Sequence, residues 1–236
     1  MAEMVIAHAS HQPTANGTIV LVHGGFSSGE EWDQVWPLLI DQGYHVLIPD
    51  LPGHGKSLGV SPFEVNDAAR RLAELIETQA KKRVAHVVAI SIGAHIAAAL
   101  TSQYPDRVES LAVSGFNLFT PGLFSPLLSP LVYMFHRSSG FWQKPTVEWE
   151  RFCKGQGSFS MTRDVLNILF SSRELQSIKA RTLVVAAIRE GIGADNVDHS
   201  RRLFATVVPD NGSRVVQHRK MRHPWNADEP GLLRRW

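Results

Sequence analysis

Short runs of β-branched and other apolar residues alternate with helical patterns along most of this 236-residue chain. The apolar runs occupy residues 18–23, 45–49, 84–90, 108–114, 182–188 and 214–217. Because these runs are mostly apolar throughout, they are typical of strands that are buried on both faces of a sheet. The helical patterns occupy residues 32–42, 65–79, 93–104 and 199–205. Repeated strand and helix units predict an α/β fold with a doubly wound, mostly parallel sheet.

One long segment, from residue 116 to about residue 178, interrupts this alternation. It holds no further run of the strand type, and four prolines divide it into short apolar pieces. We therefore expect a helical cap inserted after the fourth recognisable strand, within a single domain that spans residues 1–236. The first half of this cap is rich in Phe and Leu. Such a surface predicts packing on the sheet domain, an apolar roof over a pocket, or both.

Composition and charge narrow the classes of function. With 44% hydrophobic and 19% charged residues, the chain can bury the core that a folded domain needs. The 24 Lys and Arg residues are scattered and nearly balanced by 22 Asp and Glu residues, which argues against nucleic acid or an acidic membrane as a partner. The single cysteine, Cys153, excludes an internal disulfide, and residues 1–10 lack the pattern of a signal peptide. We expect a cytoplasmic protein without a membrane span, because prolines and a glycine break even the apolar segment 118–135.

The run at residues 84–90 leads directly into Ser91 and then into a helix of small residues. The local sequence, Ala89-Ile-Ser91-Ile-Gly93, is close to the pattern Gly-x-Ser-x-Gly. In that pattern a serine nucleophile sits on a tight turn, and small residues two places on either side let the strand and helix approach. Alanine is the smallest replacement for the first glycine. The alternative role for Ser91 is simple capping of the following helix.

The first apolar run ends in His23-Gly24-Gly25-Phe26. Glycines there let backbone N–H groups point at a bound oxyanion without hindrance from a side chain. We expect the N–H of Gly25, or less favourably that of Phe26, to act together with the N–H of Ile92. His23 itself is expected to make hydrogen bonds beneath the pocket.

A nucleophilic serine needs a base and a carboxylate that orients the base. His223 follows the last strand, in a loop that should open at the carboxyl edge of the sheet, and we favour it over His218, which lies too early in that loop. Glu190 and Asp195 both follow the fifth strand. We favour Glu190 because it comes directly after the strand end, and Asp195 remains the alternative, since its glycine-rich loop can fold back.

Together these motifs resemble those of the α/β-hydrolase superfamily, from about residue 20 to residue 230. The landmarks that carry the resemblance are the His-Gly-Gly at residues 23–25, the turn at residues 50–57, the elbow around Ser91 with residues 104–108 downstream, and the late Arg222-His223. The resemblance implies the α/β-hydrolase fold and the chain order serine, acid, histidine. A serine at the elbow is unlike the aspartate of epoxide hydrolases and haloalkane dehalogenases. The chain is most similar to the small esterases, carbon–carbon hydrolases and hydroxynitrile lyases of the superfamily.

We therefore expect acyl transfer to Ser91 from an ester, thioester, lactone or activated ketone of a small apolar substrate. No metal and no organic cofactor is expected, since the chain has no His-Glu-x-x-His pattern and one cysteine cannot build a structural zinc site. Two alternatives remain: a biosynthetic lyase or cyclase that uses the same triad, and a ligand-binding protein with suppressed turnover. An exposed part of the cap could also pair two copies of the chain into a homodimer.

Overall fold

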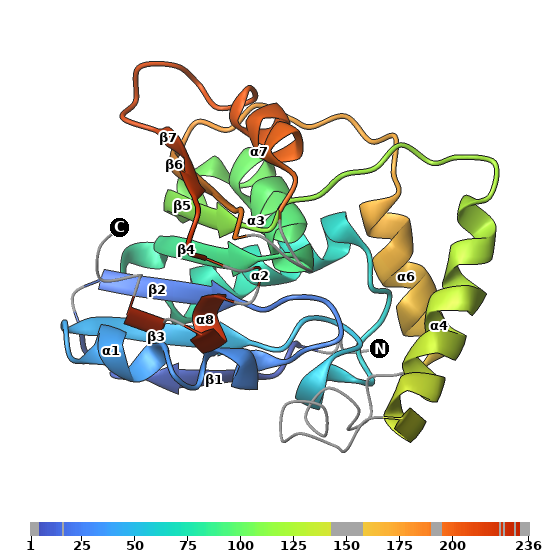
Figure 1. Ribbon diagram of the computed structural model, residues 1–236. Coiled ribbons are helices and arrows are strands. Elements are labelled where there is room, and N and C mark those ends of the chain that lie inside the picture. The colour runs from blue at the N-terminus through green and yellow to red at the C-terminus, as the bar shows by residue number, and fades with distance from the viewer. Residues whose placement is uncertain are drawn as a thin grey trace.

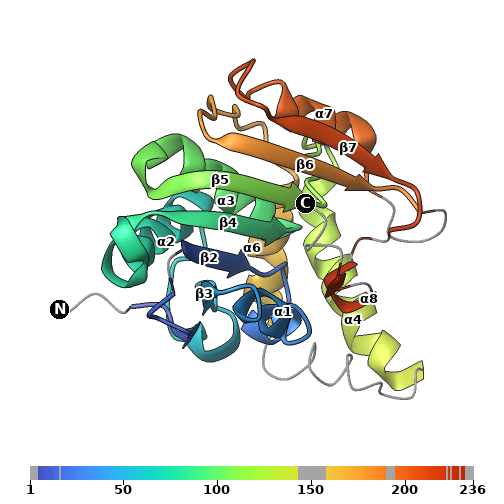
Figure 2. The same cartoon turned by 90° about the vertical axis from the view of Figure 1, so that its left-hand side faces the viewer.

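A computed structural model of the chain describes residues 5–15, 17–142, 158–189, 195–221, 223, 225–228 and 230–231. Its centre is one seven-stranded sheet in the order β1-β3-β2-β4-β5-β6-β7. The strands are β1 (His8–His11), β2 (Gly17–Val22), β3 (Tyr44–Pro49), β4 (Ala85–Ile90), β5 (Val108–Ser114), β6 (Arg181–Ala187) and β7 (Arg214–His218). All neighbouring pairs are parallel except β1 and β3. Figure 2 shows the strands stacked from β7 to β3, with the twist that parallel sheets have.

The predicted doubly wound parallel sheet is confirmed, and each of its six predicted strands lies within two residues of its expected bounds. The strand that was not predicted is β1, which pairs with β3 from His8↔Pro49 to His11↔Val46. Its sequence, His-Ala-Ser-His, has no apolar run, because this edge strand is mostly exposed and buries neither face. The other strands could be predicted because they are buried and therefore consist of apolar runs.

Helices cover both faces of this sheet, and alternate residues of each central strand face opposite layers. Val87 and Ala89 of β4 belong to a core shared with α2 (Val65–Gln79), α3 (Ile92–Gln103) and α7 (Val197–Phe204). Val88 and Ile90 pack on the other face. The residues that cover this second face come from the 3-10 helix η1 (Gly29–Trp32), α1 (Trp36–Ile40) and the short α8 (Trp225–Asp228).

The single helix predicted over residues 32–42 is wrong. The structure divides this segment into η1, which ends at Trp32, and α1, which begins at Trp36. Pro37 explains the break, since it has no N–H to donate into a preceding turn but fits the first turn of a new helix. The apolar spacing of the segment survives because Trp32, Val35 and Leu39 are all buried against the sheet.

Two helices, α4 (Ser125–Trp142) and α6 (Phe159–Leu169), follow β5 in the chain and precede β6. Figure 1 shows them side by side at one end of the sheet, and the rings of Tyr133 and Phe159 meet between them at 5.7 Å. At the base of this pair, Phe119 and Phe170 stack with ring centroids 5.1 Å apart. Cys153 lies outside the described residues. In the described part of the chain no helix combines the length and apolar character that crossing a membrane requires.

The start of α3 lies very close to the end of β2, at Gly93. A Cβ atom on Gly93 would lie 2.5 Å from the carbonyl oxygen of His23 and 2.8 Å from that of Val22. Real Cβ atoms do not approach backbone atoms this closely. A residue without a side chain at position 93 is therefore what allows α3 to start where Ser91 needs it.

Gly93→Ala is expected to lower the free energy of unfolding by about 1–3 kcal/mol, because its methyl group overpacks this junction of backbone atoms. The better helix propensity of alanine, worth about 1 kcal/mol, offsets part of that cost. Gly59→Ala is the matched control, since a Cβ at Gly59 meets no atom within 4 Å. Urea unfolding measures both variants, and wild-type stability of Gly93→Ala would contradict the close approach.

Candidate active site

Ser91 occupies the turn between β4 and α3 in a conformation that few residues other than glycine adopt. Its φ is +56° and its ψ is −122°, a strained combination of the kind that concentrates at functional sites. The N–H of Ser91 donates to the carbonyl of Ser114, at the end of β5, over 2.9 Å. The Ser91 side chain is half-buried and makes no capping hydrogen bond to α3. Helix capping, the alternative role considered for Ser91, is therefore not what this hydroxyl does.

His223 pairs with Asp195. Nδ1 of His223 lies 2.8 Å from Oδ1 of Asp195. Since a carboxylate only accepts hydrogen bonds, Nδ1 carries the proton, and Nε2 is left to accept one. The other oxygen of Asp195 accepts the N–H groups of Ala187, at 2.7 Å, and Gly115, at 3.2 Å. Three donors therefore fix this buried carboxylate in one orientation.

The carboxylate that contacts His223 is not the one we favoured from the sequence. Glu190 lies outside the described residues, whereas Asp195, the alternative, makes the contact. Asp195 reaches this point because its own N–H donates to a carbonyl at the end of β6 over 2.8 Å. The next residue, Asn196, caps α7. Asp195 is thus held between the end of β6 and the start of α7. Because Asp195 lies farther from the strand end in the sequence than Glu190, its sequence position did not predict this contact.

The ring of His223 lies directly over Gly115, the residue that follows β5. A Cβ atom on Gly115 would lie 2.1 Å from Cε1 of His223, so a larger residue would displace the ring. Gly115 follows Ser114, whose carbonyl holds the N–H of Ser91. His223 and Ser91 therefore stand at the same carboxyl edge of the sheet. His218, the competing candidate, is the last residue of β7, and its Nδ1 has no hydrogen-bond partner in the described part of the chain.

The two backbone segments predicted to form an oxyanion hole lie against each other. A Cβ atom on Gly25 would lie 2.9 Å from Cγ1 of Ile92, so these residues are in contact. Ile92 is the first residue of α3, where backbone N–H groups have no acceptor within the helix. Phe26, the less favoured donor, follows Gly25 with a φ of +61°.

His23 holds this glycine loop from beneath, which confirms the hydrogen-bonding role predicted for it. The N–H of Leu51 donates to Nε2 of His23 over 3.0 Å, so Nδ1 carries the proton and donates to the carbonyl of Gly24 over 2.6 Å. Burial, assisted by nearby His54, lowers the pKa of His23 to about 3, and the ring is neutral at physiological pH. Because the Gly24 carbonyl and the Gly25 N–H belong to one planar peptide, His23 sets the direction of that N–H.

One carboxyl group that lies beside the glycine loop was not identified from the sequence. Oε2 of Glu31 accepts the N–H of Gly24 over 2.7 Å. No motif marks Glu31, and its neighbour Glu30 is also a glutamate but is exposed. The contact depends on how η1 turns back over the loop, which local sequence patterns do not encode.

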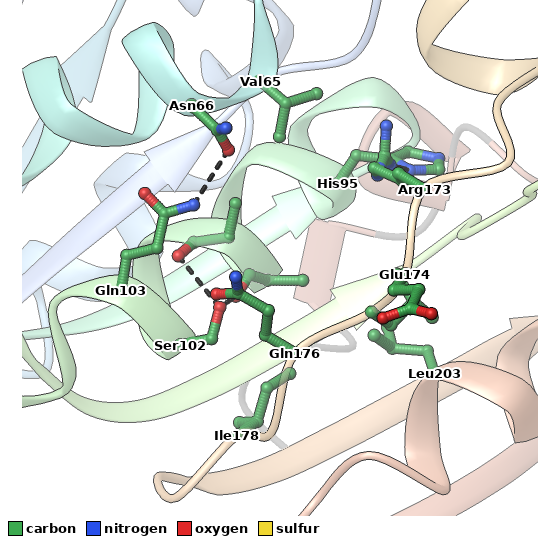
Figure 3. A pocket seen from close by; sticks show the side chains of 13 residues that line it. Val65, Asn66, His95, Ser102, Gln103, Arg173, Glu174, Gln176, Ile178 and Leu203 are labelled. Atoms are coloured by element: carbon green, nitrogen blue, oxygen red, sulfur yellow. Dashed lines mark hydrogen bonds between the residues drawn. The ribbon is translucent and has the colours of Figure 1, made fainter.

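A cavity of about 140 Å³ opens beside α3 (Figure 3). His95, Ser102 and Gln103 of α3 line it together with Arg173, and none of Ser91, Asp195 and His223 does. Arg173 donates to Nδ1 of His95, and burial lowers the pKa of Arg173 to about 10. The cavity is therefore separate from the Ser91 site. Among the described residues, no group of three or more His, Cys, Asp or Glu side chains is arranged to hold a metal ion.

The doubly wound sheet, with a serine on the turn from its central strand into the following helix, is that of an α/β hydrolase. A model of the alpha/beta hydrolase family matches residues 19–234, and the chain belongs to this family. A protein of Gibberella zeae described as an AB hydrolase superfamily protein is 59% identical over 240 residues, which cover 100% of this chain and 85% of that protein.

More distant similarities agree with this family. The 2-hydroxy-6-oxononadienedioate/2-hydroxy-6-oxononatrienedioate hydrolase of Paraburkholderia phymatum is 30% identical over 148 residues, which span 60% of this chain and 49% of that enzyme. The solved structure of a hydrolase from Pseudomonas aeruginosa superposes with a TM-score of 0.77 over 97% of this chain and 91% of its own. Its sequence identity is 19%, so this likeness concerns the fold alone.

Proposed function

We propose that this protein is a serine hydrolase that transfers an acyl group to Ser91 and then to water. The observation that carries the proposal is the conformation of Ser91, which is strained, half-buried and free of a capping bond. Strain that no capping role explains is a mark of function. The His223–Asp195 pair at the same sheet edge supplies the partner that such a serine needs.

In this mechanism Oγ of Ser91 attacks a substrate carbonyl while Nε2 of His223 takes its proton. Asp195 holds Nδ1–H and stabilises the imidazolium, which then protonates the leaving group. The N–H groups of Gly25 and Ile92 would stabilise the oxyanion, each contributing about 3 kcal/mol if it behaves like other such donors. Water, activated by His223, releases the acyl group and restores Ser91. No step in this sequence requires a metal or an organic cofactor.

The substrate class we propose is a small, largely apolar ester, thioester, lactone or activated ketone. Support comes from the many apolar side chains of the segment between β5 and β6. The Paraburkholderia phymatum relative is named for the hydrolysis of an oxo-dienedioate, so an activated ketone has a precedent among similar proteins.

A fluorophosphonate probe tests the proposal, because it forms an adduct with a serine only where that serine is activated. Intact mass should show one adduct on the folded protein and none on heat-unfolded protein. Trypsin should release residues 84–107 as one peptide, which holds both Ser91 and Ser102, and fragment ions should assign the adduct to Ser91. A folded protein that forms no adduct, or one that carries it elsewhere, would refute the proposal.

A further inference from the structure

Glu31 and Ser91 both lie beside Gly24. A Cβ atom built on Gly24 would lie 3.3 Å from Cβ of Ser91 and 3.6 Å from Oε2 of Glu31. Both residues are therefore within van der Waals reach of the same point, and a side chain at position 24 would contact both. A carboxyl group so close to the candidate nucleophile has no part in the mechanism proposed above.

This carboxyl group holds the first peptide of the glycine loop. Oε2 of Glu31 accepts the Gly24 N–H, while His23 Nδ1–H donates to the Gly24 carbonyl. Gly24 is thus fixed at both its donor and its acceptor, although glycine is the residue whose backbone loses most entropy on ordering. The next N–H along the chain is that of Gly25, the proposed oxyanion donor. A hydrogen bond to a charged acceptor is about twice as strong as a neutral one, so an ionised Glu31 holds the loop more firmly.

The carboxyl group is also connected to the histidine side of the site. Asn226 is fully buried in α8, two residues beyond the Pro that follows His223, and its Nδ2 donates to the backbone carbonyl of Glu31 over 2.9 Å. The adjacent residues Trp32 and Trp225 meet edge to face, with ring centroids 6.0 Å apart. The helices η1 and α8 therefore dock as one unit, which places Glu31 within electrostatic range of His223.

Burial disfavours the ionised form of the half-buried Glu31. Burial raises the pKa of this carboxyl, although hydrogen bonds from Gly24, Ser27 and Asn226 and the nearby charge of His223 lower it. Among the described residues, His223 is the ionisable side chain whose charge acts on it. Because the folded-state pKa lies above the ordinary value of 4.5, the free energy of unfolding falls as pH rises through that interval. A destabilising carboxylate beside reactive groups indicates a functional role.

We propose that Glu31 is a positioning residue of the active site, whose negative charge fixes the Gly24 amide and faces the imidazolium that forms on His223. The inference rests on the proposed acyl transfer to Ser91. Glu31 touches neither substrate nor reacting atoms in this role. It acts through the loop that carries Gly25 and through the charge balance of His223.

Three variants separate the charge from the hydrogen bond. Glu31→Gln keeps an oxygen that accepts the Gly24 N–H but removes the charge, and Glu31→Ala removes both. Glu30→Gln removes the exposed neighbouring carboxyl and is the matched control. With a p-nitrophenyl ester, kcat of Glu31→Gln should fall by roughly 10–100-fold with little change in KM, because a misplaced donor acts mainly in the transition state. Glu31→Ala should lose at least as much, and Glu30→Gln should match wild type.

Thermal unfolding distinguishes a positioning role of Glu31 from a purely structural one, because a structural role predicts that its removal lowers the unfolding temperature. At pH 8, Glu31→Gln should unfold at a higher temperature than wild type, and the gap should close at pH 4, where both side chains are neutral. Activity equal to that of Glu30→Gln would overturn the inference. So would a Glu31→Gln protein that is less stable than wild type at pH 8 or that fails to fold, because the charge would then serve the fold. Failure of the proposed function is a different result, since it is seen as an unlabelled wild-type protein.

Discussion

Ser91→Ala is expected to lower kcat for an activated ester by roughly 10⁶-fold, the scale on which removal of the nucleophile acts in other serine hydrolases. The variant keeps the glycine loop and His223 but has no oxygen with which to form an acyl-enzyme. Steady-state turnover of a p-nitrophenyl ester measures the loss down to the rate of background hydrolysis. Intact mass after rapid quenching should show an acyl adduct on wild type and none on the variant.

The fold of this variant should be unchanged. Alanine at position 91 retains a Cβ, so it relieves none of the strain at φ +56°, and the Ser91 hydroxyl makes no capping bond that could be lost. Ser102→Ala is the matched control on the same helix, because within the described part of the chain its hydroxyl donates to the carbonyls of Ala98 and Ala99 of that helix. Wild-type turnover by Ser91→Ala, or a comparable loss in Ser102→Ala, would contradict the assignment of the nucleophile.

The elements that could be predicted are those whose burial produces an apolar pattern within a short segment of the sequence. Helix α2 was predicted with its observed bounds, Val65–Gln79, because seven of its side chains are buried on one face. The strands β4 and β5 were predicted because most of their side chains are buried and apolar. The edge strand β1 buries neither face, and the break before α1 depends on Pro37, so periodicity alone missed both.

The same distinction applies to the candidate site. Ser91 and Gly93 belong to one local motif, since a tight turn between strand and helix demands small residues at fixed spacing. Asp195, Gly115 and Glu31 come from separate segments that meet only in the folded chain. The roles of Asp195 and Glu31 depend on which backbone N–H groups face their carboxylates. Sequence reasoning therefore identified the elbow motif around Ser91, favoured Glu190 over Asp195, and missed Glu31.

Asp195→Asn is expected to lower kcat by about 10⁴-fold, as the same change does in other serine triads. An amide at this position has one oxygen, and the N–H groups of Ala187 and Gly115 compete for it with His223. If the amide nitrogen then faces His223, the ring must present an unprotonated Nδ1, and Nε2 carries the proton instead. A protonated Nε2 cannot accept the proton of Ser91. The loss should therefore appear in kcat, with ester binding largely retained.

Two further variants decide whether this loss belongs to the triad acid. Asp198→Asn removes an exposed carboxylate from the adjoining helix α7 and should have wild-type activity. Glu190→Gln tests the acid that the sequence favoured, and it should retain most activity because Asp195 already occupies Nδ1 of His223. Severe loss in Glu190→Gln with a mild effect of Asp195→Asn would reverse the assignment. It would also imply that the Asp195–His223 hydrogen bond breaks during turnover, because Nδ1 of His223 has room for one carboxylate.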